Sequence, residues 1–283
     1  MIALGPADPR YPRALLDLRL APDPLTVDGD VSVFARRAVS VVGTRRMTPY
    51  GARVARELAM ALADAGIVVV SGLAQGIDSA AHEGALAAGG ETVAVVGAGI
   101  AEYLEEVRGK RRRLAQAIRG QGALVSEFPP DAPAQRWTFA QRDSTIAALG
   151  EATVVVEAPV DSGALITASE ARRLRRPVYA VPGPIGASAS AGTNELIAVG
   201  AARALTGAAM LLLAALGLTT AHRAEDDPRD EALVLDALAA SPSDPDALAR
   251  RLGLSTTALA AIVARLVIRG RVATAGDGRL ARR

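Results

Sequence analysis

The chain has 283 residues, of which half are apolar, with a formal net charge of +2 and no cysteine. This length accommodates one large core and a small second domain, and the near-neutral charge confines any nucleic-acid surface to a local patch. Without cysteine and with only two histidines, the chain offers no thiolate nucleophile, and we expect no metal, no cofactor and no catalytic residue.

The N-terminal segment is rich in proline. Residues 1–37 predict an N-terminal arm packed on the main domain, with one short apolar helix at 12–20 and a turn at 28–30. The first residues are acidic and proline-containing where a signal peptide would need a basic start and an apolar core. We therefore expect a cytoplasmic protein.

From residue 38 onward, short apolar runs alternate with longer amphipathic ones. The short runs are β-branched and lack two-residue alternation, which is typical of parallel strands covered on both faces. The longer runs indicate helices. This alternation predicts an α/β fold, a Rossmann-like doubly wound and mostly parallel sheet over residues 38–217. The expected strands are 38–43, 67–71, 92–97, 123–126, 152–157 and 177–181, and the expected helices are 48–65, 77–88, 103–120, 138–149 and 164–175.

The C-terminal part has a different pattern. The most apolar stretch, 208–218, is too short to span a bilayer, so no membrane association is expected. Residues 218–229 are interpreted as a linker, and 230–283 as a small winged helix built from three short helices and a terminal hairpin. The last helix has few side chains suited to reading bases, which favours a protein-contact or nonspecific DNA role.

Glycine, hydroxyl and arginine side chains follow the expected strands at their carboxyl ends, where ligands bind in an open parallel sheet. Glycine lets the backbone approach an anion closely, and hydroxyls and guanidinium groups donate to phosphate oxygens. Tight turns also need glycine, so each loop taken alone has a structural explanation. Together the loops predict a cradle for the sugar-phosphate chain of a polynucleotide, with Gly43, Thr44, Arg45, Arg46, Ser71, Gly72, Gln75, Gly76, Ser162, Gly163 and Thr167 as binding residues.

Other phosphate sites are not expected. Lys110 is the only lysine and no glycine-rich loop leads into it, which excludes a Walker-type loop. Gly97 and Gly99 would begin a dinucleotide fingerprint, but Glu102 stands where its third glycine belongs. The basic run 108–113 reads as a solvated helix face, with a phosphate-gathering role as the alternative.

Several strings, in chain order, closely resemble the DNA-processing protein A (DprA/Smf) family. They are VVGTRRMTPYG (41–51), SGLAQGIDSAAHEGAL (71–86), SEFPP (126–130), VVVEAPVDSGALITASEA (154–171), VYAVPGP (178–184) and GTNELIAVGA (192–201). The resemblance implies a non-enzymatic homodimer that binds single-stranded DNA taken up during natural transformation, protects it and helps to load the RecA recombinase.

The chain departs from the family pattern at cationic positions. Gln75 stands where the family usually has arginine, and Arg142-Asp143-Ser144 replaces Arg-Asn-Arg. The resemblance adds the surviving Arg142 to the predicted DNA-binding residues. Each lost cation removes about one released counterion, which weakens binding and flattens its salt dependence.

Two alternatives remain open. The domain also resembles nucleotide-binding enzymes of the nucleoside-monophosphate phosphoribohydrolase type, with Glu127 and Glu157 as available acids and residues 192–195 as a superficial echo of their phosphate motif. The other alternative is a pure interaction module, in which the glycine loops are scaffold and the helices bind RecA.

Overall fold

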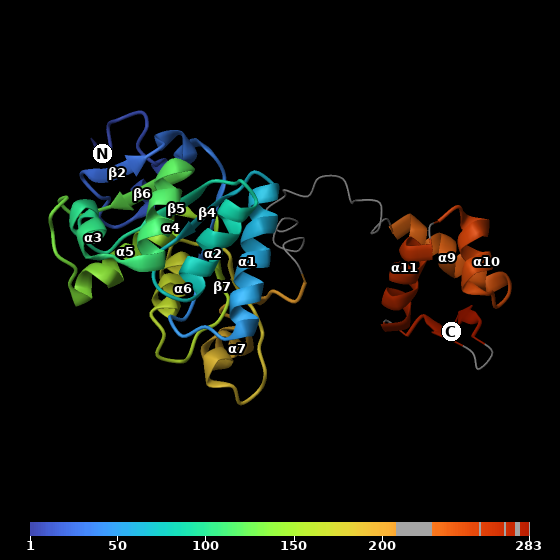
Figure 1. Cartoon of the computed structure of the whole chain (residues 1–283). Helices are drawn as coiled ribbons and strands as arrows, with labels where there is room; N and C mark the ends of the chain where they lie inside the picture. Colours follow the sequence, from blue (N-terminus) through green and yellow to red (C-terminus); the bar gives the residue numbers. More distant parts are fainter. Residues whose placement is uncertain (208–227, 255, 269, 275–277, 283) are drawn as a thin grey trace. The chain divides into compact units, whose positions relative to one another are not determined.

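The computed structural model describes residues 1–207, 228–254, 256–268, 270–274 and 278–282. Contacts divide the chain into two compact units, Met1–Leu216 and Gly217–Arg283 (Figure 1). The expected linker lies outside the described residues up to position 227, and its last two residues begin a helix of the second unit. Within the described ranges, no helix has the length and apolarity needed to cross a bilayer.

The larger unit is built on a nine-stranded sheet with the order β1-β2-β6-β5-β4-β3-β7-β8-β9. From β6 to β9 every neighbouring pair is parallel, which confirms the predicted doubly wound sheet. The central strands are valine-rich and buried on both faces, as their continuous apolar runs indicate. The strands are β1 (Ile2–Leu4), β2 (Leu25–Gly29), β3 (Ala38–Val42), β4 (Val68–Ser71), β5 (Thr92–Val95), β6 (Gly122–Ser126), β7 (Ala152–Val155), β8 (Val178–Ala180) and β9 (Arg203–Ala204).

The chain order reverses at β3, which pairs with β4 on one side and with β7 on the other. In an open α/β sheet such a switch point leaves a crevice beyond the carboxyl ends of the two strands. Helix α2 contacts both α1 and α4, and α5 contacts α6. The helices of this unit are α1 (Pro49–Asp64), α2 (Ile77–Ala87), α3 (Ile100–Glu106), α4 (Gly109–Gly120), α5 (Arg136–Leu149), α6 (Ala164–Arg173) and α7 (Ala191–Ala198).

The N-terminal arm forms part of the sheet itself. Strands β1 and β2 pair antiparallel with each other, and β2 pairs antiparallel with β6, so the arm extends the sheet at one edge. Asp28, expected in a turn, lies in β2 and forms an ion pair with Arg119 at 2.8 Å. The expected helix at 12–20 is reduced to a 3₁₀ turn at Arg13–Asp17.

The expected helix at 103–120 is divided into α3 and α4. Val107 and Arg108 are extended between them, and Gly109 has φ of +61°, a backbone conformation that ends a right-handed helix. One continuous helix was predicted here because the apolar residues of α3 and α4 follow a single helical periodicity.

The second unit is a winged helix, as predicted. Helices α9 (Pro228–Ala240), α10 (Pro245–Leu252) and α11 (Thr256–Ile268) precede an antiparallel hairpin of β10 (Val272–Thr274) and β11 (Leu280–Arg282). A compact apolar core that includes Val234, Leu248 and Ile262 joins these elements. Residues 275–277, between the two strands of the hairpin, lie outside the described residues.

Candidate nucleic-acid interface

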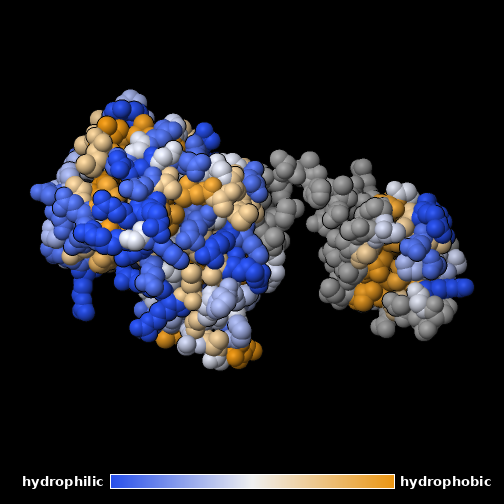
Figure 2. All heavy atoms as spheres, in the orientation of Figure 1, coloured by the Kyte–Doolittle hydropathy of each residue, from blue (hydrophilic) through white to orange (hydrophobic). Residues whose placement is uncertain are grey.

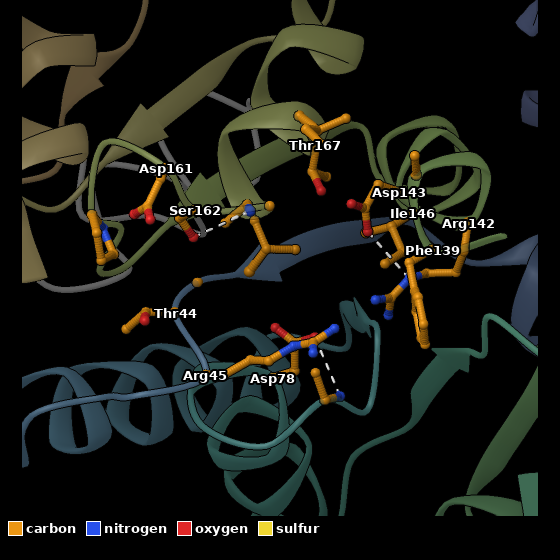
Figure 3. Close-up of a pocket in the computed structure, with 18 of the residues that line it drawn as sticks. Thr44, Arg45, Asp78, Phe139, Arg142, Asp143, Ile146, Asp161, Ser162 and Thr167 are labelled. Atoms are coloured by element: carbon orange, nitrogen blue, oxygen red, sulfur yellow. Dashed lines mark hydrogen bonds and ion pairs between the residues drawn. The ribbon is translucent and has the colours of Figure 1, made fainter. Parts of the chain in front are cut away.

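A pocket of about 470 Å³ lies at the carboxyl edge of the sheet, where the loops after β3 and β7 meet. Figure 3 shows its floor and walls, to which β3, α2, α5 and α6 contribute. We call it the switch pocket, because it lies at the reversal of strand order. It contains eight of the predicted residues, Gly43, Thr44, Arg45, Arg46, Arg142, Ser162, Gly163 and Thr167.

A second pocket adjoins the first and shares Arg45, Phe139 and Arg142 with it. Gly72 and Gln75 line this adjoining pocket. The structure therefore brings ten of the twelve predicted residues, from three loops and from α5 and α6, to one edge of the sheet.

Two predicted residues line neither pocket. The Ser71 hydroxyl is fully buried and donates to the carbonyl of Val41 at 2.6 Å. Gly76 has φ of +92°, and its Cα lies against the backbone of Thr44 and Arg45, where a side chain would collide. Their contacts join the loop after β4 to the loop after β3.

Arg45 and Arg46 are the accessible cations of the switch pocket. Both are exposed, and within the described part of the chain neither guanidinium is ion-paired with a carboxylate. The Arg45 guanidinium lies 5.5 Å from the centroid of the Phe139 ring. These two side chains can therefore turn to an external anion without breaking an internal ion pair.

Arg142 has a different environment. It is buried, its Nη1 donates to the carbonyl of Gly72 at 2.7 Å, and its Nε lies 3.1 Å from Oδ1 of Asp143. A side chain at position 72 would overlap this guanidinium, which explains the glycine there. Arg142 thus holds the loop after β4 and contributes positive charge from beneath the pocket.

Carboxylates also line the switch pocket, and the sequence patterns did not place them there. Asp78 comes from the first turn of α2, Asp143 from α5, and Asp161 from the loop after β7. Burial raises the pKa of Asp143 to about 6, although the positive charge of Arg142 opposes the shift. Burial also raises the pKa of Asp78. The pocket therefore combines exposed cations with two buried acids whose pKa values are raised.

The N-terminus of α6 contributes to the same pocket. Ala164, its first residue, lines the pocket together with Thr167 one turn later, and the Ser162 hydroxyl accepts from the Ala164 amide at 3.4 Å. The first amides of a helix carry partial positive charge, which favours an anion at this end. Backbone, hydroxyl and guanidinium donors therefore converge on one cavity.

The two acids considered for an enzyme are both engaged in structural contacts. Glu157 is buried and accepts from the amide and the hydroxyl of Thr48, at 2.9 and 2.5 Å. Glu127 accepts from Thr145 and Gln141 at 2.6 and 2.8 Å, and burial raises its pKa. These carboxylates tie strand ends to helices.

Replacing Thr48 by alanine should reduce the free energy of unfolding of the larger unit by about 1–2 kcal/mol, because α1 loses its N-cap and Glu157 a hydrogen-bond donor. Thr48 accepts from the Gly51 amide at 3.2 Å. Urea denaturation measures the loss. Thr48→Ser keeps the oxygen and should retain most of the stability; equal losses in both variants would show that the cap is not the cause.

Other glycine-containing segments are filled by the protein itself. The Phe139 ring lies against Gly97, and the carbonyls of Pro129 and Pro130 lie against Gly99, where a side chain would collide with them. Gly183 bonds the side chain of Asn194 through both its amide and its carbonyl, at 3.1 Å each. In the basic run, residues 108–113 are exposed, and Arg111 lines the adjoining pocket.

Fold and site together define a class: a Rossmann-like α/β protein with a cation-lined pocket at its topological switch point and a separate winged helix. Residues 3–215 match the family model described as DNA recombination-mediator protein A, and residues 218–278 match the DprA winged helix domain. The chain belongs to the DNA-processing protein A (DprA/Smf) family.

Curated relatives carry the same family names. The chain is 41% identical over 201 residues to Protein Smf of Escherichia coli, covering 70% of this chain and 53% of that protein. It is 47% identical over 168 residues to a putative DNA processing protein DprA of Mycobacterium tuberculosis, covering 59% and 42%. The chain therefore spans about half the length of these relatives.

Two solved structures share the fold. The DNA processing protein A of Streptococcus pneumoniae superimposes with a TM-score of 0.69 at 34% identity, covering 75% of this chain and 73% of that one. The Helicobacter pylori protein gives 0.66 at 28% identity, covering 73% and 92%, and its description concerns its single-stranded DNA binding mode.

Proposed function

We propose that this protein binds single-stranded DNA and takes part in DNA processing during natural transformation, protecting incoming strands and helping to load RecA in the cytoplasm. We infer a binding role without catalysis. The observation that carries this proposal is the pair of exposed guanidinium groups of Arg45 and Arg46 at the rim of the switch pocket, neither of which is ion-paired with a carboxylate among the described residues. The single-stranded DNA binding described for the Helicobacter pylori relative supports the same choice of ligand.

The arrangement of the two pockets favours a polynucleotide over a mononucleotide. They share Arg45 and Arg142, so their donors form a continuous track along the carboxyl edge of the sheet. A single strand has a phosphate at every nucleotide, so it can place phosphates in both pockets at once. The phosphate of a mononucleotide can occupy only one of the two pockets. Backbone amides and guanidinium groups read phosphates without regard to sequence.

A salt-titrated binding curve on fluorescent single-stranded oligonucleotides tests the proposal. We expect affinity to fall with salt, with a slope of about −0.7 per phosphate neutralised. Affinity no greater than that of an unrelated protein of the same net charge, even at low salt, would reject DNA binding. Release of free base from AMP would instead revive the enzyme alternative.

Gln75→Arg should tighten single-strand binding about threefold and steepen its salt slope by about 0.7, because it adds one cation at the rim. Gln75 is exposed and lines the adjoining pocket beside Arg45. Gln116→Arg, an exposed position in α4 away from both pockets, adds the same charge and is the control. Equal effects of the two variants would mean that only net charge matters.

A homodimer is part of the proposal. The segments that follow β7 and β8 in the chain carry exposed apolar side chains, among them Val160, Ile185 and Val199. Figure 2 shows hydrophobic residues at the end of the larger unit where α7 lies. Burying such side chains against a second copy removes them from water. Light scattering should give twice the monomer mass, and Ile185→Glu should reduce it.

A further inference from the structure

The tryptophan beside the switch pocket is unusually accessible. Trp137 is the only tryptophan in the sequence, and 56% of its surface is exposed. Tryptophan side chains are on average highly buried, because exposing their large apolar ring to water is unfavourable. An exposed indole next to a cluster of phosphate donors is therefore a candidate contact surface.

The exposed indole is held in place. Its Nε1 donates to Oε1 of Gln135 at 2.6 Å, and the ring makes an edge-to-face contact with Phe128 at 5.6 Å between centroids. This contact covers at most one face of the indole. A ring fixed in this way loses little conformational entropy when a planar partner stacks on it.

The first turn of α5, which carries the indole, also carries two residues that line the switch pocket. Arg136 and Phe139, on either side of Trp137 in this turn, both line the switch pocket. A helix rises about 1.5 Å per residue, so these positions span only about 5 Å along the axis. Phe139 has the guanidinium groups of Arg45 and Arg142 at 5.5 and 5.9 Å from its ring centroid. Of these two aromatic rings, Trp137 is the more exposed, at 56% against 36% for Phe139.

We propose that Trp137 is a stacking platform for an unpaired base of the DNA strand whose phosphates are bound at the switch pocket. The inference rests on the proposed function. The face of an aromatic ring carries partial negative charge and does not attract phosphate, whereas every nucleobase presents a π-face that stacks on an indole. The neighbouring Arg136 guanidinium can neutralise the phosphate next to that base. Paired bases are already stacked within the duplex, so the platform selects single strands.

The single tryptophan makes the contact directly measurable. Titration of the full chain with a mixed-sequence single-stranded oligonucleotide should change the intrinsic fluorescence of Trp137. An oligonucleotide of equal length made of abasic sugar-phosphate units should change it much less. Trp137→Ala should weaken binding of the intact oligonucleotide about tenfold, and Trp137→Phe should recover part of the loss.

Met60→Ala is the matched control, because Met60 is an exposed apolar side chain near the far end of α1. It should leave binding unchanged. Binding of a labelled oligonucleotide by the wild type, without a fluorescence change and with equal affinity for Trp137→Ala, would overturn the stacking inference and leave the proposed function standing. An equal fluorescence response to the abasic chain would also overturn it. Absence of binding by the wild type would instead reject the proposed function itself, and with it the inference.

Discussion

Replacing Arg45 and Arg46 together with alanine should weaken single-stranded DNA binding on the order of 30-fold at low salt, because two charge-assisted phosphate contacts are lost. The salt slope should fall in magnitude by about 1.4, the value for two phosphates of a single strand. Both side chains are exposed at the pocket rim, so the larger unit should fold as before. Fluorescence anisotropy at several salt concentrations measures both quantities.

Arg13→Ala combined with Arg19→Ala is the control for this double variant. Both arginines are exposed in the N-terminal arm, so the same charge is removed away from the switch pocket. It should leave the affinity within about twofold of the wild type, since separated exposed charges are screened by salt. Equal weakening by the two double variants would place the DNA surface elsewhere.

Asp143→Asn should tighten single-strand binding at neutral pH and remove most of its pH dependence. The pKa of Asp143 is raised to about 6 by burial, so the carboxyl is neutral below this pH and negative above it. A polyanion binds the neutral form better, so wild-type affinity should rise as the pH falls through about 6. If phosphate binds only the neutral form, the gain from about pH 7.5 to about pH 5.5 is at most about 25-fold.

Other ionisable groups lie around Asp143 and affect the pH dependence that this experiment measures. Arg142 and Arg45 favour its charged form, and Asp78 opposes it. Burial raises the pKa of Asp78 as well, so Asp78 is a second pocket carboxyl that can contribute to the pH dependence left in Asp143→Asn. His82 is buried and its pKa is lowered to about 3, so it stays neutral over this range.

Asp64→Asn removes one exposed carboxylate at the end of α1 and should leave the pH profile unchanged. Anisotropy titrations at both pH values measure the effect, and thermal unfolding confirms that each variant is folded. A pH profile that is the same in Asp143→Asn and the wild type would show that this carboxyl does not control the pocket.

The candidate site was only partly predictable. Glycine, hydroxyl and arginine residues after the strands identified the correct edge of the sheet, because the carboxyl ends of parallel strands share one edge. Side-chain direction was not predictable from these patterns. Arg142 lines both pockets, but its guanidinium also bonds to the carbonyl of Gly72, and the Ser71 side chain points into the protein. Asp78 and Asp161 were missed because they lie in separate segments, and no local spacing links them to the binding loops.

The sequence by itself determined the doubly wound sheet and the winged helix. Strands buried on both faces and amphipathic helices each have a characteristic pattern of apolar residues within a short stretch of sequence. Only the tertiary structure decided that the loops after β3 and β7 meet, that β1 and β2 extend the sheet, and that Arg45 and Arg46 stay accessible while Arg142 is enclosed. The pairing of β3 with β7 joins residues more than 100 positions apart. Such contacts depend on the packing of the whole core, so they cannot be predicted from local sequence patterns.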